Sequence, residues 1–235
     1  MKDKVKTSAD KLKTKNKIKK SIKIALLVLI LLLLILYIIF GIIFNHGSFS
    51  IRLDPDLYHK NGIIIYDDPD YKVFRTHLTA PTLDFMDNIA GTWLDILSPN
   101  LHEHSGGSHN GDNFIAYTFF VENMGQNVAD YWTEIIIDDV TRNVDEAIRV
   151  RVYRNGERTT YAKISRNGTP EPDTVPFFSD TIIMRERVQG FAPGDINKYT
   201  IVMWIEGTDP ECTDNILGGL IQIHMDFKSE VIIRN

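Results

Sequence analysis

The chain has 235 residues, of which 26 are Lys or Arg and 31 are Asp or Glu, so its net charge at neutral pH is −5. Ten of the lysines lie in residues 1–23, which leaves 16 basic and 29 acidic residues for the rest of the chain. An acidic main body argues against nucleic-acid binding, and a single cysteine excludes an internal disulfide framework.

Residues 1–23 form a basic tail, and residues 24–45 follow it as a predicted transmembrane helix. The run from Ile24 to Phe44 holds 21 residues without a charge. As a helix it would be roughly 32 Å long, enough to cross the hydrocarbon core of a bilayer. It is longer than the apolar core of a signal peptide, and no Ala-x-Ala-like cleavage site follows it. We therefore predict an uncleaved signal-anchor that contacts the lipid bilayer through residues 24–45.

The lysine-rich flank also predicts the orientation, because cytoplasmic segments next to a membrane span carry an excess of Lys and Arg. The N-terminus is then cytoplasmic, and residues 46–235 form an extracellular domain of a single-pass protein of the cell membrane. About 190 residues are ample for one self-sufficient core. The domain must form this core without covalent cross-links.

Patterns with a period of two residues dominate this domain and predict β-strands. Ile148, Val150 and Val152 alternate with polar or large residues, and residues 220–228 alternate in the same way, as in strands with one solvated face. Residues 114–121, 131–140 and 199–205 are apolar on both faces, as expected for central or covered strands.

Turn residues separate these strands. Asn155-Gly156, between residues 150–154 and 157–161, is a strong signal for a two-residue hairpin. Apart from one or two helical turns within residues 84–97, no amphipathic helix is predicted after the membrane span. Many short strands without alternating helices predict a mainly β fold, an antiparallel β-sandwich.

Two segments break the strand pattern. Residues 54–70 are predicted to be acidic loops around a short strand at residues 63–66, and residues 98–112 to be a mobile loop. The acidic sequences at residues 54–56 and 67–70 offer oxygen ligands for calcium, but they lack the ligand spacing of an EF-hand, and Asp next to Pro is ordinary turn composition. Calcium is therefore an alternative to the simpler interpretation as turns.

The loop 98–112 contains His102, His104 and His109, which are candidate ligands for zinc or copper. A loop rich in Gly and Ser does not hold such ligands in place, and no His-Glu-x-x-His helix is present. We therefore expect no cofactor, with zinc as the alternative. Two further sets of residues are expected to face solvent on strands: His224 on one strand and Arg149 with Arg151 on another.

Residues 204–212, with the sequence WIEGTDPEC, gather three carboxylates and the one cysteine at the end of an apolar strand. Gly207 is expected to end the strand, and Thr208-Asp209-Pro210 to form a turn. Cys212 has no neighbouring His or second Cys to activate it. We interpret the segment as a strand connection. Because the chain also lacks a Gly-x-Ser-x-Gly elbow, a phosphate loop and a dinucleotide fingerprint, we predict no catalytic residues.

Residues 120–125, FVENMG, followed by residues 128–131, VADY, resemble the Asn-x-Gly signature of the TasA and camelysin group. This group comprises surface and biofilm-matrix proteins of Gram-positive bacteria. Residues 191–195, 199–207 and 209–212 look like segments of uncharacterised exported proteins with a related fold. The resemblance covers about residues 48–228 and implies a jelly-roll-like sandwich.

In the fibre-forming members of the group, a released N-terminal segment completes the sheet of a neighbouring molecule, whereas here the helix is predicted to stay attached. Some camelysin-like members have been described as metalloproteases, but their zinc motif has no match in this chain. The resemblance therefore implies no catalytic residue.

Together these features favour a membrane-anchored structural or interaction module at the bacterial cell surface, with a matrix role implied by the resemblance. The partner would be a protein, or a second copy that pairs through sheet edges. One alternative is a metal-dependent hydrolase built on His102, His104 and His109. Another is an accessory domain that joins a membrane complex through its transmembrane helix.

Overall fold

The computed structural model describes residues 19–37, 48–81, 83 and 85–229, and the chain divides into two units, residues 1–45 and 46–235. The first unit contains helix Lys19–Tyr37, which has the length and the apolar composition of a membrane-spanning helix or a signal sequence. Residues 1–18 of the basic tail and residues 38–45 of the predicted span lie outside the described residues.

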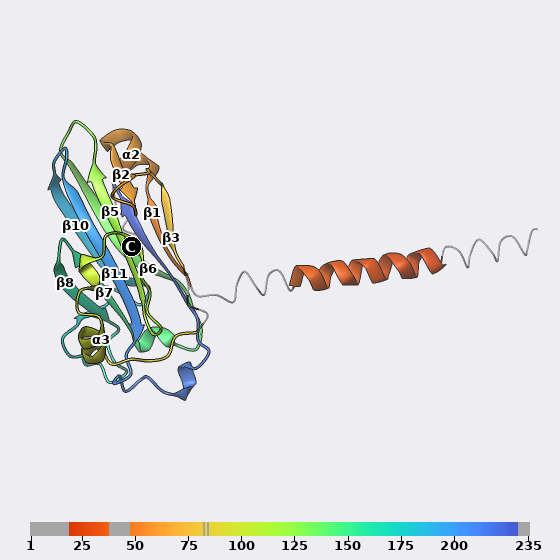
Figure 1. Ribbon diagram of the computed structural model, residues 1–235. Helices are drawn as coiled ribbons and strands as arrows, with labels where there is room; N and C mark the ends of the chain where they lie inside the picture. The colour runs from red at the N-terminus through yellow and green to blue at the C-terminus, as the bar shows by residue number, and fades with distance from the viewer. Residues whose placement is uncertain (1–18, 38–47, 82, 84, 230–235) are drawn as a thin grey trace, which may run out of the picture. The chain divides into compact units, whose positions relative to one another are not determined.

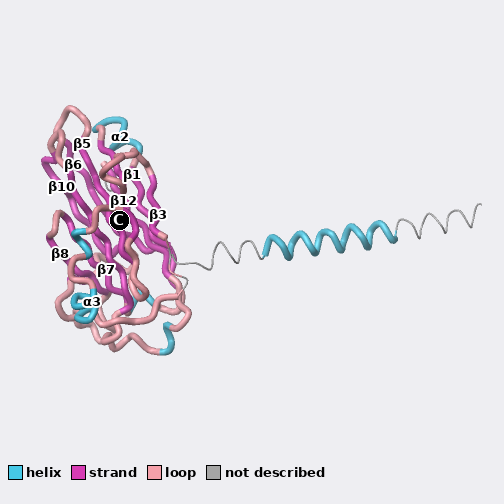
Figure 2. Tube along the Cα trace, viewed as in Figure 1, coloured by secondary structure: helices cyan, strands magenta, loops and turns pink. Residues whose placement is uncertain are grey.

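The second unit is mainly β and consists of two sheets (Figure 1). The five-stranded sheet has the order β10-β6-β12-β1-β3, with β10 Ile182–Phe191, β6 Ala129–Val140, β12 Ile221–Lys228, β1 Ser48–Leu53 and β3 His77–Ala80. The seven-stranded sheet has the order β2-β5-β11-β7-β8-β9, with β4 paired to β5; its strands are β2 Ile63–Tyr66, β5 Ile115–Asn123, β11 Ile196–Ile205, β7 Ile148–Arg154, β8 Glu157–Ala162, β9 Val175–Pro176 and β4 Gly107–Ser108. Neighbouring strands are antiparallel except for the pairs β1–β12 and β8–β9. Two short helices, α2 Pro55–Asn61 and α3 Gly91–Leu97, join strands (Figure 2).

The two sheets pack face to face around one apolar core. Phe119 of β5 contacts Phe227 of β12 edge to face, with ring centroids 5.9 Å apart. The hydroxyl groups of Tyr131 in β6 and Tyr199 in β11 are 3.0 Å apart, and Asn197 Nδ2 donates to Tyr131 at 2.7 Å. These three buried polar side chains therefore satisfy one another, as most buried polar groups do. The predicted sandwich of two packed sheets is confirmed.

The strands expected from sequence periodicity are present, and the hairpin prediction is confirmed in detail. Asn155 and Gly156 both have positive φ angles, 53° and 89°, as a type I′ turn requires. They connect β7 to β8, with Arg154 paired to Glu157. The strands β1, β3, β4, β9 and β10 were not predicted.

A second apolar cluster covers the outer face of the seven-stranded sheet. It joins Leu94 of α3 to Phe114, which precedes β5, and to side chains on β5, β7 and β11, namely Ala116, Tyr153, Val202 and Trp204. This cover explains why β11 is apolar on both faces. Arg149 and Arg151 were predicted to face solvent. This prediction is wrong, because both side chains are buried under this layer and the segment after β8.

Residues 98–112, predicted to be a mobile loop, include short elements of regular structure. The segment contains a 3-10 helix, Leu101–Glu103, and the strand β4, in which Gly107 pairs with Thr118 of β5. Asn110 donates to Pro81 O and accepts from Ala116 N, both at 2.9 Å. The segment is therefore bonded to the sheet at several points, despite its Gly and Ser content.

Part of the acidic segment 54–70 is helical. Asp54 accepts a hydrogen bond from Asp56 N at 2.9 Å as the N-cap of α2, Pro55 occupies the first helical turn, and Gly62 ends the helix with φ of 72°. Each of these residues is a standard helix boundary signal. The Asp54-Pro55-Asp56 sequence thus starts a helix, and the predicted strand at residues 63–66 follows it as β2.

The Asn-x-Gly sequence at residues 123–125 forms a corner where three elements meet. Asn123 Nδ2 donates to Phe191 O at 2.8 Å and to Asn127 O at 3.0 Å, and its Oδ1 accepts from Gly125 N at 2.9 Å. A Cβ on Gly125 would lie 2.0 Å from Asn61 O, so the close approach of α2 requires glycine there. This sequence therefore has a structural role.

His224 is buried, contrary to the expectation that it faces solvent. Its Nδ1 lies 2.7 Å from Asp138 Oδ2 and its Nε2 lies 3.4 Å from Asp226 Oδ2. Burial lowers the pKa of His224, but the hydrogen bonds and charges of Asp226 and Asp138 outweigh it and raise the pKa above its ordinary value. These contacts bind β12 to β6 on the outer face of the five-stranded sheet.

Candidate functional site

Residues 204–212 tie the end of β11 to the start of α3. Trp204 Nε1 donates to Glu206 Oε2 at 3.0 Å, and Gly91 N donates to the same oxygen at 2.9 Å. Thr208 Oγ1 donates to Glu206 Oε1 at 2.7 Å. Burial raises the pKa of Glu206, but these hydrogen bonds outweigh it and hold the pKa below its ordinary value. Burial, together with the nearby charge of Asp209, raises the pKa of the Cys212 thiol. The geometry therefore gives Cys212 no activation as a nucleophile.

Glu171, Asp209 and Glu211 form a carboxylate cluster, in which one oxygen of each lies within 4.8 Å of the others. Arg149 Nη2 donates to Asp209 Oδ2 at 2.6 Å and to Glu171 Oε2 at 3.1 Å. Burial and the charge of Asp209 raise the pKa of Glu171. Carboxylate oxygens suit calcium, but a guanidinium already lies between two of the three. The cluster is therefore a buried ion-pair network around Arg149.

A polar groove of about 770 Å³ lies over the outer face of β7, β8 and β11, beside α3. Arg151 packs over the ring of Trp204, 4.8 Å from its centroid, and pairs with Asp95 of α3. Asp95 also accepts from Arg158 at 3.2 Å. Because these arginines already pair with carboxylates, their charges are balanced within the groove. The groove therefore offers hydrogen-bonding groups rather than a strong electrostatic potential of one sign.

The helix α3 carries exposed apolar side chains next to this groove. Trp93, Ile96 and Leu97 are 59%, 67% and 67% exposed, whereas Leu94 is fully buried. Residues spaced i, i+3 and i+4 lie on one helical face, so these three form one apolar strip, which we call the α3 ridge. The sequence analysis missed this ridge, although the spacing was visible within residues 91–97.

Two histidines of the loop 98–112 stack on each other, and the third stacks on a tyrosine. The rings of His104 and His109 stack with centroids 4.0 Å apart and planes 8° from parallel, and the ring of His102 stacks on Tyr153. Lone pairs of imidazole lie in the ring plane, so two stacked rings direct them along parallel planes rather than toward one ion. Among the residues that the structure describes, one set of three Asp, Glu, His or Cys side chains has ligand atoms within 4.8 Å of one another, and this set is the carboxylate cluster.

We expect zinc to leave the melting temperature of the full-length chain unchanged in detergent, because the three histidine rings offer no common coordination point. Thermal melting with and without zinc, together with metal analysis of the purified chain, checks this. The triple variant with His102, His104 and His109 replaced by Ala is the matched control. Stoichiometric zinc in the wild type that is lost in the triple variant would favour a metal-dependent hydrolase instead.

The other candidate metal ligands make hydrogen bonds within the protein. Asp67 Oδ2 accepts from Tyr117 at 2.6 Å, and Asp68 Oδ1 accepts from Asp70 N at 2.9 Å. Asp54 caps α2, and Asp56 pairs with Lys60 at 2.8 Å. These carboxylates therefore shape turns and a helix end, and the structure does not bring the two acidic sequences together as one calcium site.

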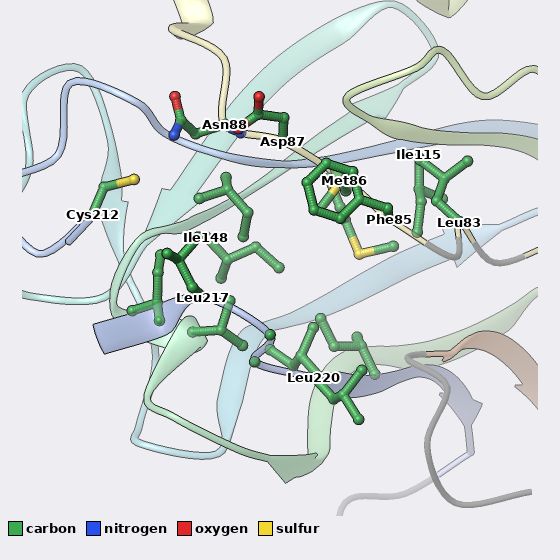
Figure 3. A pocket seen from close by; sticks show the side chains of 18 of the residues that line it. Leu83, Phe85, Met86, Asp87, Asn88, Ile115, Ile148, Cys212, Leu217 and Leu220 are labelled. Carbon is green, nitrogen blue, oxygen red and sulfur yellow. The ribbon is translucent and has the colours of Figure 1, made fainter. Parts of the chain in front are cut away.

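An apolar pocket of about 290 Å³, here called the inter-sheet pocket, opens at the end of the sandwich where β11 ends and β12 begins (Figure 3). Ile148, Met203 and Ile205 line it from the seven-stranded sheet, and Ile223 from the five-stranded sheet. Cys212 also lines it. No sequence signal marks this pocket, because its walls come from six separate segments of the chain.

No protein-family model and no curated protein matches the chain. Two solved structures of a β-glucosidase from Kluyveromyces marxianus are similar to it, one in complex with glucose and one labelled with selenomethionine. They have TM-scores of 0.26 and 0.23, sequence identities of 8% and 12%, and cover 72% and 69% of this chain. The chain spans 15% and 16% of the length of those two chains. At these values the likeness carries no argument about fold or activity.

Proposed function

We propose that the chain is a membrane-tethered interaction module at the cell surface, which binds a protein partner through the α3 ridge and the adjoining polar groove. Helix Lys19–Tyr37 supplies the anchor, and residues 46–235 form the extracellular binding domain. The observation that carries the proposal is the exposed apolar ridge of Trp93, Ile96 and Leu97. In this proposal the domain is a jelly-roll-like relative of the TasA and camelysin group, with a structural or matrix-related role.

The composition of this surface supports a protein partner. Trp and Arg are enriched among the residues that dominate binding energy at protein interfaces. Trp93 is exposed on the ridge, and Arg158 and Asp95 form an ion pair beside it. An apolar centre next to hydrogen-bonding groups is the usual arrangement of such an interface.

Self-association through sheet edges is supported less well. β10 is the longest edge strand, with ten residues, and it carries Arg185, Glu186 and Arg187 and pairs with β6 in an irregular register. Charged residues and bulges are common means of blocking pairing at sheet edges. The other edges, β3, β2 and β9, have four residues or fewer.

The orientation can be tested directly. Because the lysine-rich tail precedes the apolar span, we expect protease added to intact protoplasts to digest residues 46–235 and to spare the tail. Immunoblots with tags at the two ends of the chain measure this. A protected C-terminal tag would contradict the extracellular placement, and a soluble product that begins near Ser48 would contradict the uncleaved anchor.

We expect Trp93→Ala to weaken partner binding by roughly thirtyfold or more, since truncation of an interface hot spot costs about 2 kcal/mol or more. The melting temperature should stay close to that of the wild type, because this side chain is exposed.

The partner is first identified by crosslinking. A photo-crosslinking amino acid at position 93, in cells that naturally express the chain, should trap a discrete partner. The affinity of this partner for the wild type and for Trp93→Ala is then measured. Tyr71, which is also exposed, is the control position. Equal crosslinking at positions 71 and 93 would contradict the proposal.

A further inference from the structure

The inter-sheet pocket is lined mainly by apolar side chains, and its rim carries exposed ones. Phe85 and Leu217 both line the pocket, yet they are 75% and 60% exposed, so they lie at its mouth (Figure 3). Leu83 and Leu220 lie beside them, while Ile223 and Met203 form the buried walls. The volume of about 290 Å³ is near the lower end of the roughly 300–1,000 Å³ that is usual for ligand pockets.

The pocket lies close in the chain to the predicted membrane span. Ser48, the first residue of β1, lines the pocket and comes four residues after Phe44, the last residue of the apolar run. Four extended residues cover at most about 14 Å. If the apolar run occupies the bilayer, Ser48 therefore stays within that distance of the end of the run, whatever arrangement the two units adopt.

The charged groups at the pocket favour one kind of lipid headgroup. The charged residues among those lining it are Asp87 and Asp214, and Asn88 adds an amide. Two carboxylates repel an anionic headgroup and attract an ammonium group. The rim is therefore suited to a zwitterionic phospholipid, whose headgroup carries an ammonium group.

We propose that the inter-sheet pocket binds an acyl chain of an amine-bearing phospholipid from the bilayer in which the chain is anchored. The apolar walls would take the hydrocarbon, Phe85 and Leu217 would contact it at the mouth, and Asp87 and Asp214 would face the ammonium group. Each methylene that the pocket takes out of water would stabilise such a complex. The inference rests on the membrane anchor of the proposed function and is independent of the α3 ridge.

The test uses the full-length chain in phospholipid nanodiscs that contain phosphatidylethanolamine with a diazirine on one acyl chain. After photolysis, mass spectrometry maps the lipid adducts. We expect adducts on peptides with Met203, Leu217 or Ile223, in addition to adducts on helix Lys19–Tyr37, which serve as an internal control. Adducts confined to that helix would overturn the proposal. Equal labelling of the pocket by a diazirine-bearing phosphatidylglycerol would contradict the proposed preference for an ammonium headgroup.

Two variants at exposed leucines make the test specific. Leu217→Asp places a charge at the mouth and should reduce the pocket adducts roughly tenfold or more, while the helix adducts stay unchanged. Leu97→Asp, on the α3 ridge, should leave both sets of adducts intact. Pocket adducts that persist in Leu217→Asp would contradict the binding mode. Loss of partner crosslinking at position 93 with intact pocket adducts would contradict the proposed function alone.

Discussion

Trp204→Ala is expected to destabilise the domain of residues 46–235 strongly. The Trp204 ring is 1% exposed, packs with Leu94 and Tyr153 in the cluster under α3, and lies beneath the guanidinium of Arg151. Truncation of a buried Trp to Ala costs about 3–5 kcal/mol, against a total domain stability of roughly 5–15 kcal/mol. It also removes the Nε1 donor to buried Glu206, which adds to the loss.

Thermal melting of the full-length chain in detergent measures this effect. For a domain of this size, a loss of about 3–5 kcal/mol lowers the melting temperature by roughly 6–20 °C. Cys212→Ser and Glu211→Gln are the matched controls in the same segment, and both should melt close to the wild type. Glu211 has one buried oxygen without a hydrogen-bond partner and lies among like charges, so loss of its charge removes repulsion. If either control kept the fold but abolished partner binding, residues 204–212 would be a binding site after all.

The strands and the hairpin could be predicted because their signals are local. Alternation in β12, the two-sided apolar pattern of β11 and the Asn155-Gly156 turn each depend on neighbouring residues along the chain. The burial of Trp204 followed from the same pattern. The helix α2 was interpreted as a loop, although Asp54, Pro55 and Gly62 are ordinary helix boundary residues.

The charged interior could not be predicted in this way. Periodicity assigned Arg149 and Arg151 to a solvated face, but their partners Asp209 and Asp95 lie 60 and 56 residues away in the chain. His224 is paired with Asp138 across 86 residues. A polar residue on a strand indicates solvent only when nothing covers that face, and the cover here comes from segments that have no strand pattern of their own.

The candidate binding surfaces depend on the same long-range packing. The side chains of the α3 ridge are exposed because Leu94 is buried against β11, and this orientation of α3 directs Trp93 and Ile96 toward solvent. The inter-sheet pocket is lined by residues of both sheets and of the loops between them, and no single segment encodes this. Composition and periodicity predicted the apolar N-terminal helix and the mainly β fold, whereas the candidate sites required the arrangement of distant elements.

Arg149→Met is expected to destabilise the domain by about 3–5 kcal/mol at pH 7.5. Arg149 is the guanidinium that separates Asp209 from Glu171, and all three side chains are at least nine-tenths buried. Met has a similar volume, so the change removes a charge rather than packing. A buried pair that loses one partner leaves an uncompensated buried charge, which costs about 3–5 kcal/mol. Here the carboxylate cluster would also lose the cation that offsets its mutual repulsion.

The pH dependence separates this mechanism from a packing defect. Burial and the charge of Asp209 already raise the pKa of Glu171 above 4.5, and the loss of Arg149 must raise it further. A carboxyl group with a raised pKa in the folded state stabilises the fold fully below its unfolded pKa and loses this contribution as the pH rises through the folded value. The loss in free energy of unfolding caused by Arg149→Met, measured by urea unfolding, should therefore be largest at pH 7.5 and should shrink toward pH 5.

Arg187→Met is the control, because it breaks an exposed pair with Asp130, and it should cost about 0–1 kcal/mol. A deficit for Arg149→Met that stays the same at both pH values would show that Met fits the site poorly, and would contradict the role of Arg149 as the counterion of the cluster.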